Sequence, residues 1–410
     1  MRIRDRWLIA VLALLVCGAP GAADWTQWGG PRQDFKADSP GLAAWGDDGP
    51  KQIWSRELGD GYSGILVQGD RLFTMYTHGE QEAVIALDAG TGKTVWEQSY
   101  ESRPREGHVT QFGTGPRATP LIVGDKIYTI GIAGLMHCLK KTDGSVIWKQ
   151  DLWGEGFNGN FLNHGYSSSP TVYKDTVIAL VGGKGAAVVA FDKTTGKVKW
   201  KAQDFENSYS TPRIMKVDGK DQLVTFMATE IIGMDPANGD LLWSYSHQNQ
   251  WKQNVNMPVM ADGNHIFFSS PEAGARGLKL TNEGGKTKVE ELWSTRKIQF
   301  YHVTSVRSGD WVYGSTGATG PAFMAAVNIR TGDIAWRERG MAKANVLGAG
   351  DQLVILDEDG KLYLATASPE GLEVAAETQI FDGTSWTVPT VTGKTMYLRD
   401  KKTIVALDLS

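Results

Sequence analysis

One eleven-residue motif recurs along this chain at fixed offsets, and it constrains the fold more than any other feature. Its first complete copy reads Ala86-Leu-Asp88-Ala-Gly-Thr-Gly92-Lys-Thr-Val-Trp96. An Asp-like position, a glycine four residues later and a tryptophan eight residues later recur at Lys140/Gly144/Trp148, Asp192/Gly196/Trp200, Asp235/Gly239/Trp243 and Asn328/Gly332/Trp336. Five copies in one register indicate a repeat protein rather than a set of unrelated domains.

Each copy predicts a β-hairpin. An apolar strand, residues 84–87 in the first copy, runs into the Asp-like position, the glycine takes a positive φ in the turn, and the next strand carries the tryptophan. We expect that indole to be wedged between neighbouring sheets, where each one buries roughly 150–250 Å². Burial between units stabilises repeats that have no core of their own.

A second hairpin precedes each of these, with turns predicted at Gly69/Asp70, Gly124/Asp125, Lys174/Asp175, Lys220/Asp221, Gly263/Asn264, Gly309/Asp310, Gly350/Asp351 and Gly393/Lys394. Third strands are predicted near Val84, Leu135, Val188, Ile231, Leu278, Ala325, Leu362 and Val405. In the seventh repeat, the fourth strand, near Val374, has a degenerate sequence. The eighth repeat has no fourth strand of its own, while an unassigned strand lies at residues 51–58. The sequence therefore predicts an all-β, eight-bladed β-propeller of four-stranded antiparallel blades, closed by pairing of the N- and C-terminal strands. Seven blades is the alternative if residues 365–377 have been over-interpreted.

The first residues have the layout of a cleaved secretory signal. Three arginines, at positions 2, 4 and 6, precede ten apolar residues at 7–16, and small residues end at Ala23. We therefore divide the chain into a signal peptide at 1–23, an N-terminal extension at 24–50 and the propeller at 51–410. The expected location is the periplasm or the outside of the cell. Lipid attachment at Cys17 is disfavoured because the bulky Val16 precedes the cysteine.

Charge and cysteine content exclude several classes of protein. Without residues 1–23, which carry three arginines and one aspartate, the net charge of −4 becomes −6, and no basic cluster suggests a nucleic-acid partner. Cys138 is then the only cysteine, so no intramolecular disulfide can form. No later stretch has the ~20 apolar residues of a transmembrane helix. We expect an exported monomer.

The repeat unit Ala-x-Asp-x-x-Thr-Gly-x-x-x-Trp resembles the tryptophan-docking motif of the quinoprotein alcohol dehydrogenase-like superfamily and its pyrroloquinoline-quinone-like (PQQ-like) repeat relatives. The runs Trp25-Thr-Gln-Trp28-Gly-Gly-Pro31 and Gly115-Pro-Arg117-Ala-Thr-Pro120 look like a bacterial branch of PQQ-binding-like β-propeller repeat proteins. The resemblance covers about residues 25–410 and includes the BamB-like group, a non-enzymatic scaffold of outer-membrane barrel assembly. Because the motif builds contacts between blades, the resemblance implies the fold and leaves the activity open.

Candidate ligand contacts lie near the propeller axis, where Thr-Pro-like pairs such as Thr119/Pro120 mark the innermost strands. The residue two positions before each pair is expected to face the axial rim by strand periodicity. Those positions hold Tyr62, Arg117, Ser167, Tyr209, Val255, Val303 and Trp386, with His164, Tyr166 and His302 close by in sequence. An arginine beside aromatic rings suits a flat anion such as PQQ, and the alternative is that these side chains only plug the channel.

A PQQ dehydrogenase needs more than a binding rim. The resemblance implies a catalytic aspartate and a calcium ion, and the methanol-dehydrogenase branch adds two adjacent cysteines, which are absent here. The acids Asp357, Glu358, Asp359, Asp382 and Asp400 do not fall in a calcium-loop spacing. The histidines show no zinc spacing, and no Gly-x-Ser-x-Gly occurs. We predict no metal site and name no catalytic residue.

Three functions remain open from the sequence. The leading hypothesis is an exported, non-catalytic scaffold that binds an envelope protein or a small ligand. The second is a PQQ-dependent alcohol or sugar dehydrogenase with an atypical site. The third is a carbohydrate-binding module that uses Tyr62, Tyr209 and Trp386 on one rim.

Overall fold

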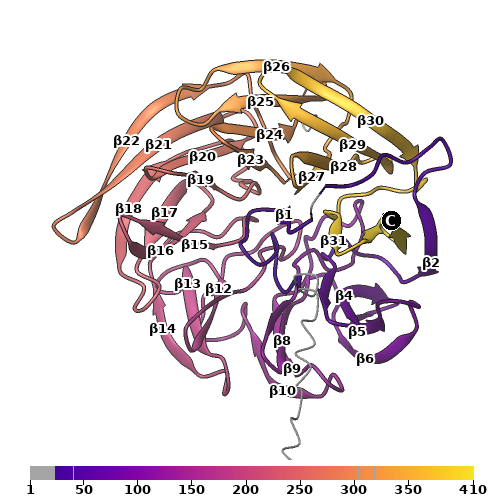
Figure 1. The fold of residues 1–410 in the computed structure, drawn as a ribbon. Helices are drawn as coiled ribbons and strands as arrows, with labels where there is room; N and C mark the ends of the chain where they lie inside the picture. Colours follow the sequence, from indigo (N-terminus) through magenta and orange to yellow (C-terminus); the bar gives the residue numbers. More distant parts are fainter. Residues whose placement is uncertain (1–23, 40, 303, 318–319) are drawn as a thin grey trace, which may run out of the picture.

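The computed structural model describes residues 24–39, 41–302, 304–317 and 320–410, and each regular element in these ranges is a β-strand. The expected signal peptide, with Cys17, lies outside the described residues, and so does Val303. The strands form eight sheets around one axis, which confirms the eight-bladed propeller (Figure 1). In blades one to seven, four consecutive strands follow one another from the axis outward, and each is antiparallel to the next.

Blades one to four follow the chain without interruption. Blade one contains β3 (Leu66–Gln68), β4 (Arg71–His78), β5 (Gln81–Asp88) and β6 (Thr94–Glu101). Blade two contains β7 (Leu121–Val123), β8 (Lys126–Ile130), β9 (Leu135–Lys140) and β10 (Val146–Asp151). Blade three contains β11 (Thr171–Tyr173), β12 (Thr176–Leu180), β13 (Val188–Asp192) and β14 (Val198–Ala202). Blade four contains β15 (Arg213–Val217), β16 (Lys220–Phe226), β17 (Glu230–Met234) and β18 (Leu241–Ser246).

Blades five to seven continue the same pattern. Blade five contains β19 (Val259–Ala261), β20 (His265–Ser270), β21 (Gly274–Glu283) and β22 (Lys286–Thr295). Blade six contains β23 (Val306–Ser308), β24 (Trp311–Ser315), β25 (Phe323–Asn328) and β26 (Ile334–Arg339). Blade seven contains β27 (Asn345–Ala349), β28 (Gln352–Leu356), β29 (Lys361–Ser368) and β30 (Gly371–Gln379). The fourth strand of blade seven, which has a degenerate sequence, is therefore a regular strand of nine residues. The alternative of seven blades is wrong.

Blade eight joins the two ends of the chain. Its inner strands are β31 (Thr390–Thr392), β32 (Thr395–Arg399) and β33 (Thr403–Asp408), and its outer strand is β2 (Lys51–Glu57). β2 pairs antiparallel with β33, with Lys51 opposite Asp408 and Trp54 opposite Ala406. Figure 1 shows β2 at the rim beside the C-terminus. The predicted closure of the ring by a composite blade is confirmed.

One predicted turn is wrong. We placed the first hairpin turn of blade four at Lys220/Asp221, but Val217 pairs with Lys220, so the turn is Asp218 and Gly219. These two residues have φ of 48° and 80°. A left-handed pair of this kind fits Gly and Asp, which tolerate positive φ, and the two charged residues that follow continue the strand.

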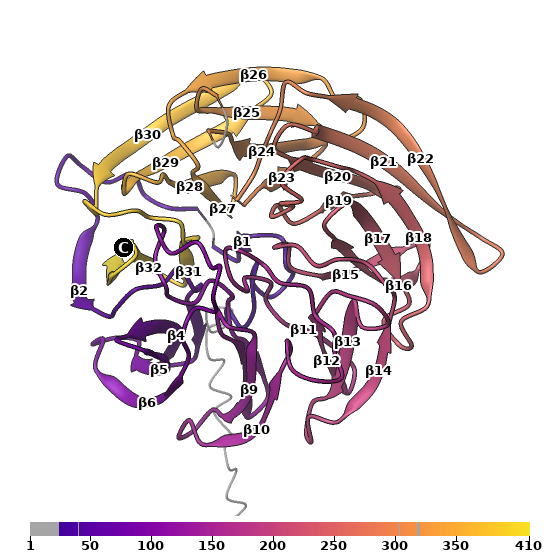
Figure 2. The same ribbon diagram turned by 180° about the vertical axis from the view of Figure 1, so that it is seen from behind.

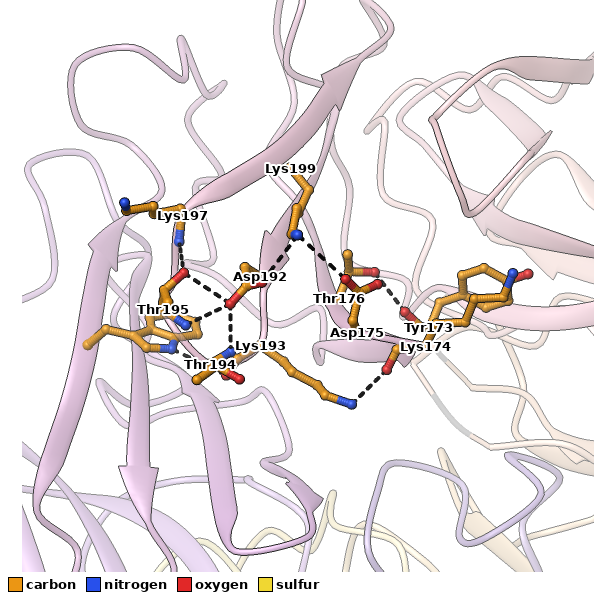
Figure 3. Close-up of polar contacts among 11 residues, drawn as sticks. Tyr173, Lys174, Asp175, Thr176, Asp192, Lys193, Thr194, Thr195, Lys197 and Lys199 are labelled. Atoms are coloured by element: carbon orange, nitrogen blue, oxygen red, sulfur yellow. Dashed lines mark hydrogen bonds and ion pairs between the residues drawn. The ribbon is translucent and has the colours of Figure 1, made fainter.

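The Asp-like position of the motif orders its own turn (Figure 3). Asp192 Oδ1 accepts hydrogen bonds from the backbone N–H of Thr194 at 3.0 Å and of Thr195 at 2.8 Å, and from the Thr195 hydroxyl at 3.0 Å. These bonds lower the pKa of Asp192 to about 2. Lys199 Nζ lies 3.3 Å from Asp192 and 3.5 Å from Asp175, so it joins the two hairpin turns of blade three. Asp88 and Thr91 make the same bonds in the first copy, so Asp and Thr fix the turn where the motif has both.

Tryptophans of the outermost strands pack on the motif of the next blade. At four seams the indole Nε1 donates to the carbonyl oxygen of the residue after the Asp-like position, in the pairs Trp54–Ala89 (2.9 Å), Trp96–Lys141 (2.9 Å), Trp148–Lys193 (3.4 Å) and Trp293–Ile329 (3.0 Å). The motif glycine lies under the same ring, and a Cβ on Gly144 would stand 2.5 Å from Trp96 Cε3. The expected wedging of indoles between sheets is confirmed.

The seam between blades four and five differs because β21 and β22 form a long hairpin in place of the motif turn. Trp243 Nε1 donates to Gln222 Oε1 of its own blade at 2.7 Å. Gln222 Nε2 in turn donates to Thr287 Oγ1 at 2.8 Å and to Asn282 Oδ1 at 3.3 Å on the long hairpin. A chain of side-chain hydrogen bonds therefore replaces the direct contact between indole and carbonyl.

The N-terminal segment, residues 24–50, crosses one end of the central channel (Figures 1 and 2). It starts at the turn of blade one, where Asp24 Oδ1 accepts the Gly69 N–H at 3.1 Å. Gln33 Nε2 then donates to Thr171 Oγ1 of blade three at 3.3 Å. β1 (Lys36–Ala37) pairs in parallel with β27 of blade seven. The segment closes the face that carries the hairpin turns, which we call the turn face.

A buried arginine fastens blade eight to blade one. Arg399 of β32 is fully buried, and its Nη1 donates to Thr74 Oγ1 at 3.0 Å and to the Met75 carbonyl at 2.9 Å. Its Nη2 donates to the Gly61 carbonyl at 2.9 Å. Burial lowers the pKa of Arg399 to about 10, so the guanidinium stays charged near neutral pH. This seam has the contacts that keep the ring closed.

We predict that Gly144→Ala destabilises the protein more than Gly124→Ala. Both glycines have positive φ, 74° and 63°, but a Cβ on Gly124 meets nothing within 4 Å, whereas one on Gly144 meets the Trp96 indole. The difference between the two unfolding free energies is expected to be about 1–3 kcal/mol, the cost of overpacking. Equal destabilisation in chemical denaturation would refute the docking contact as a source of stability.

Arg399→Met should destabilise the fold by about 3–5 kcal/mol, because it leaves buried carbonyl groups without a donor. The exposed Arg296 provides the matched control, and Arg296→Met is expected to change the unfolding free energy by less than about 0.5 kcal/mol. Thermal and urea unfolding measure both. Similar midpoints for the two variants would show that the seam is not held by this side chain.

Candidate functional site

The predicted rim residues lie on the face opposite the turns. Each blade has four antiparallel strands, so the segments that connect the outermost strand of one blade to the innermost strand of the next gather on one face. We call it the loop face. Its segments are 58–65, 102–120, 152–170, 203–212, 247–258, 296–305 (without residue 303), 340–344 and 380–389.

Three aromatic residues surround Trp386 at the axial end of this face. The Trp386 ring centroid lies 5.1 Å from that of Tyr62, 4.9 Å from that of His302 and 5.7 Å from that of Phe112. Lys343 Nζ lies 5.8 Å from the same ring. These rings are contributed by segments far apart in sequence, so the propeller closure is what brings them together.

The contacts continue around the axis. Phe112 and His164 have ring centroids 6.0 Å apart, and His164 and Tyr209 have centroids 5.9 Å apart. Tyr301 packs edge-on against His302 at 4.8 Å. We define the axial cluster as Tyr62, Phe112, Arg117, His164, Tyr209, Tyr301, His302 and Trp386. Tyr62 and Tyr209 are buried, and burial raises the pKa of each to about 12.

Arg117 is the cation of the axial cluster, and two of its N–H groups donate to backbone oxygens. Its Nη1 donates to the His164 carbonyl at 2.6 Å, and its Nη2 donates to the Gly113 carbonyl at 3.3 Å. Burial lowers its pKa, while the nearby Tyr62 and Asp60 act in the opposite direction. The guanidinium therefore holds two loops together.

The two histidines of the axial cluster are neutral near pH 7. Burial lowers the pKa of His302 to about 3, helped by the positive charge of Lys343. Burial also lowers the pKa of His164, with a further contribution from Arg117. His302 Nε2 is buried and has no hydrogen-bond partner among the residues that the structure describes. This nitrogen is a buried polar atom that a ligand or a water molecule could satisfy.

Six of the residues named as candidate contacts come together in the axial cluster: Tyr62, Arg117, His164, Tyr209, His302 and Trp386. Tyr166 does not, because its backbone N–H bonds to the Ile132 carbonyl and its ring packs against Trp153 at 6.1 Å, in the core of blades two and three. It follows Gly165, whose φ of 77° turns the chain away from the rim.

Sequence reasoning missed Phe112, Tyr301, Lys343 and Glu358. Glu358 Oε2 lies 2.7 Å from Lys343 Nζ and accepts a bond from Trp386 Nε1 at 3.3 Å. Phe112 and Tyr301 lie in long loops that lack a two-residue period, so no alternation marked them. The one sequence feature that could have indicated Phe112 and Tyr301 is that they lie close in sequence to Arg117 and His302.

The arrangement does not fit PQQ with calcium. The rings contact one another, and Nη1 and Nη2 of Arg117 each donate to a backbone oxygen. The candidate acids serve the fold: Asp357 Oδ1 accepts the backbone N–H groups of Asp359 and Lys361, and Asp400 Oδ1 accepts those of Lys402 and Thr403. No group of three metal-ligating side chains occurs in the part of the chain that the structure describes. We derive no step through these groups.

Comparisons with known proteins separate fold from family. The structure resembles quinohemoprotein alcohol dehydrogenase from Comamonas testosteroni with a TM-score of 0.64 at 13% identity, covering 94% of this chain and 80% of that chain. BamB from Moraxella catarrhalis matches with a TM-score of 0.56 at 15% identity, covering 87% of this chain and 97% of that chain. At such identities, both likenesses show the fold alone.

Sequence comparison is more specific. Outer membrane protein assembly factor BamB of Shewanella oneidensis is 22% identical over 340 residues, which are 82% of this chain and 72% of that protein. The family model described as outer membrane protein assembly factor BamB matches residues 35–109 and 80–338, well over half of the chain. With the eight blades and the docked tryptophans, these matches show that the chain belongs to the outer membrane protein assembly factor BamB family of PQQ-like β-propellers.

Proposed function

We propose that this chain is an exported, non-catalytic scaffold that takes part in protein assembly in the bacterial envelope by binding another envelope protein through its loop face. Family membership supports the class of function, since the relatives are described as outer membrane protein assembly factors. The charged start and apolar run of residues 1–23 support export. The described part of the chain contains no helix of the length and hydropathy that crossing a bilayer requires.

The observation that carries the proposal is where the chain exposes aromatic side chains. Phe112, Phe161 and Trp251 are 38%, 47% and 41% exposed, and all three lie in loop-face segments. The other large apolar side chains that the described residues expose are aliphatic and lie on outermost strands. Aromatic residues are enriched where protein interfaces gain most of their binding energy. The loop face is therefore the surface best suited to a protein partner.

The loops around Phe161 have the rigidity that a binding surface needs. Phe161 stacks on His108 with ring centroids 4.9 Å apart, and Arg105 lies 5.0 Å from the Trp153 ring. Arg105 also pairs with Asp151 at 2.9 Å. Contacts between two neighbouring loops hold the exposed ring in place before a partner arrives, which reduces the entropy lost on binding.

The interior of the axial cluster supports a non-catalytic role. Its arginine binds backbone carbonyls and its rings pack on one another, so the cluster fills the end of the channel. A filled end gives the loops a fixed base. The aromatic rings that remain free to contact another molecule are those at the surface of the loops.

Photo-crosslinking in the native envelope tests the partner. A crosslinking amino acid at position 161 is expected to capture a subunit of the outer-membrane assembly machinery, and one at position 198 is not. Phe161→Ala and Trp251→Ala should each weaken binding to that subunit about tenfold. Val198, which is 43% exposed on β14, is the control, and Val198→Ala should leave the affinity unchanged. Equal crosslinking from both positions would contradict the loop-face assignment.

We further predict that purified protein mixed with PQQ and calcium does not reduce an electron-accepting dye in the presence of alcohols or sugars. The reason is that Nη1 and Nη2 of Arg117 and the ring faces of the axial cluster are engaged within the protein. Dye reduction and equilibrium dialysis measure turnover and binding. Tight PQQ binding with turnover that Arg117→Ala abolishes would overturn the non-catalytic assignment.

A further inference from the structure

The turn face holds a second feature, independent of the proposed partner surface. Where the N-terminal segment meets blades four to six, a cavity of about 80 Å³ opens. It is lined by Gln33, Asp34, Phe35, Lys36, Arg213, Met257, Val259, Met260, Ser305 and Arg307. One water molecule needs roughly 10–15 Å³ of such space, so the cavity has room for a ligand of about five heavy atoms.

Three cations face this cavity from three separate elements. Lys36 lies on β1, Arg213 on β15 and Arg307 on β23. Within the residues that the structure describes, none of the three forms an ion pair with a carboxylate. Three cations from distant positions in the sequence therefore line the same cavity, and none of them is paired with a carboxylate among the described residues.

The one carboxylate in the lining is occupied elsewhere. Asp34 Oδ1 accepts the Lys36 backbone N–H at 3.1 Å, and Asp34 Oδ2 accepts Arg32 Nε at 3.2 Å. Arg32 also pairs with Asp38 at 2.6 Å. Both oxygens of Asp34 are thus used within the N-terminal segment, and the three cations keep an excess of positive charge.

Arg213 has no close hydrogen-bond acceptor among the described residues. Its only hydrogen bonds within the described residues are long, from Nη1 to the Pro258 carbonyl at 3.5 Å and from Nη2 to the Arg32 carbonyl at 3.3 Å. Burial lowers the pKa of Arg213 to about 10, so it stays charged at neutral pH. Burial also lowers the pKa of Lys36; the carboxylate of Asp34 acts in the opposite direction, and the positive charge of Arg307 adds to the lowering. A half-buried guanidinium whose hydrogen bonds are long is stabilised by an anion that accepts from it.

We propose that this cavity binds a small oxyanion, of the size and charge of inorganic phosphate, between Lys36, Arg213 and Arg307. The planar guanidinium presents paired N–H donors that match two oxygens of such an ion, and the lysine adds a third contact from the N-terminal segment. A neighbouring groove shares Arg213 and Met260 with the cavity and extends between the first hairpins of blades four and five. That groove gives the ion a route from solvent.

Binding at this position would fasten the N-terminal segment to the blades. β1 touches the propeller through two backbone pairs with β27, Lys36 opposite Gly348 and Ala37 opposite Ala349. An anion bound by Lys36 of β1 and by the arginines of blades four and six would connect the segment to the propeller a second time, on the side of the channel away from blade seven. The site therefore couples occupancy by an oxyanion to the seating of the segment that closes the turn face.

Titration calorimetry of the full chain with inorganic phosphate, at constant ionic strength set by chloride, tests the site. Saturable binding is expected, together with a rise in the thermal unfolding midpoint. Arg213→Gln and Lys36→Gln should each weaken binding at least about tenfold, the loss expected for one charge-assisted contact. Lys288→Gln, on the exposed end of the long hairpin, should bind as the wild type does.

A competition experiment identifies the source of the anion, and a second variant keeps the proposal testable if the first does not fold. Displacement of phosphate by N-acetylglutamate assigns the site to an acidic side chain of a peptide, and no displacement assigns it to the free ion. Because Arg213 is half-buried, Lys36→Gln decides the matter if the Arg213 variant does not fold. The proposal is overturned if the wild type shows no saturable binding below about 10 mM phosphate, or if folded variants bind as tightly as the wild type.

Discussion

The contact between an indole and the glycine of the next blade is the interaction on which this propeller depends. A four-stranded blade buries little on its own, so the ring is stable only if each blade covers the flank of its neighbour. Trp96 does this by donating to the Lys141 carbonyl and lying over Gly144. The same two contacts recur at Trp54 with Ala89 and Gly92. Because Trp54 belongs to the composite blade, the repeat contact also closes the ring.

This contact explains why the fold could be predicted from the sequence. The Asp-like residue accepts N–H groups of the turn, the glycine leaves room for the ring, and the tryptophan follows eight positions after the Asp-like residue. All three therefore recur at a fixed spacing that is visible in the sequence. The N-terminal segment left none. Its partners, such as Thr171 for Gln33 and Gly348 for Lys36, are one-off contacts over long sequence distances. Local pattern carries no information about contacts of that kind.

Part of the candidate site was predicted from the sequence, and strand geometry explains which residues were found and which were missed. Tyr62, Arg117, Tyr209 and Trp386 lie four residues before an innermost strand begins, where the direction of a side chain still follows from the strand. Tyr166 holds a place one residue earlier in its loop, after a left-handed glycine, and its ring enters the core instead. Phe112 and Tyr301 reach the axis from loops whose path only the closed propeller determines.

The two ends of the channel are closed by different chemistry, and this difference follows from the topology. Loops between blades supply the loop face, so it can gather aromatic rings from every blade without disturbing a hairpin turn. The turn face has only tight turns, and a separate segment must cross it. That segment brings Lys36 to two arginines that the innermost strands already carry. The excess of positive charge in this cavity is thus a consequence of closing the channel with the chain's own N-terminal residues, and the proposed oxyanion would balance that charge.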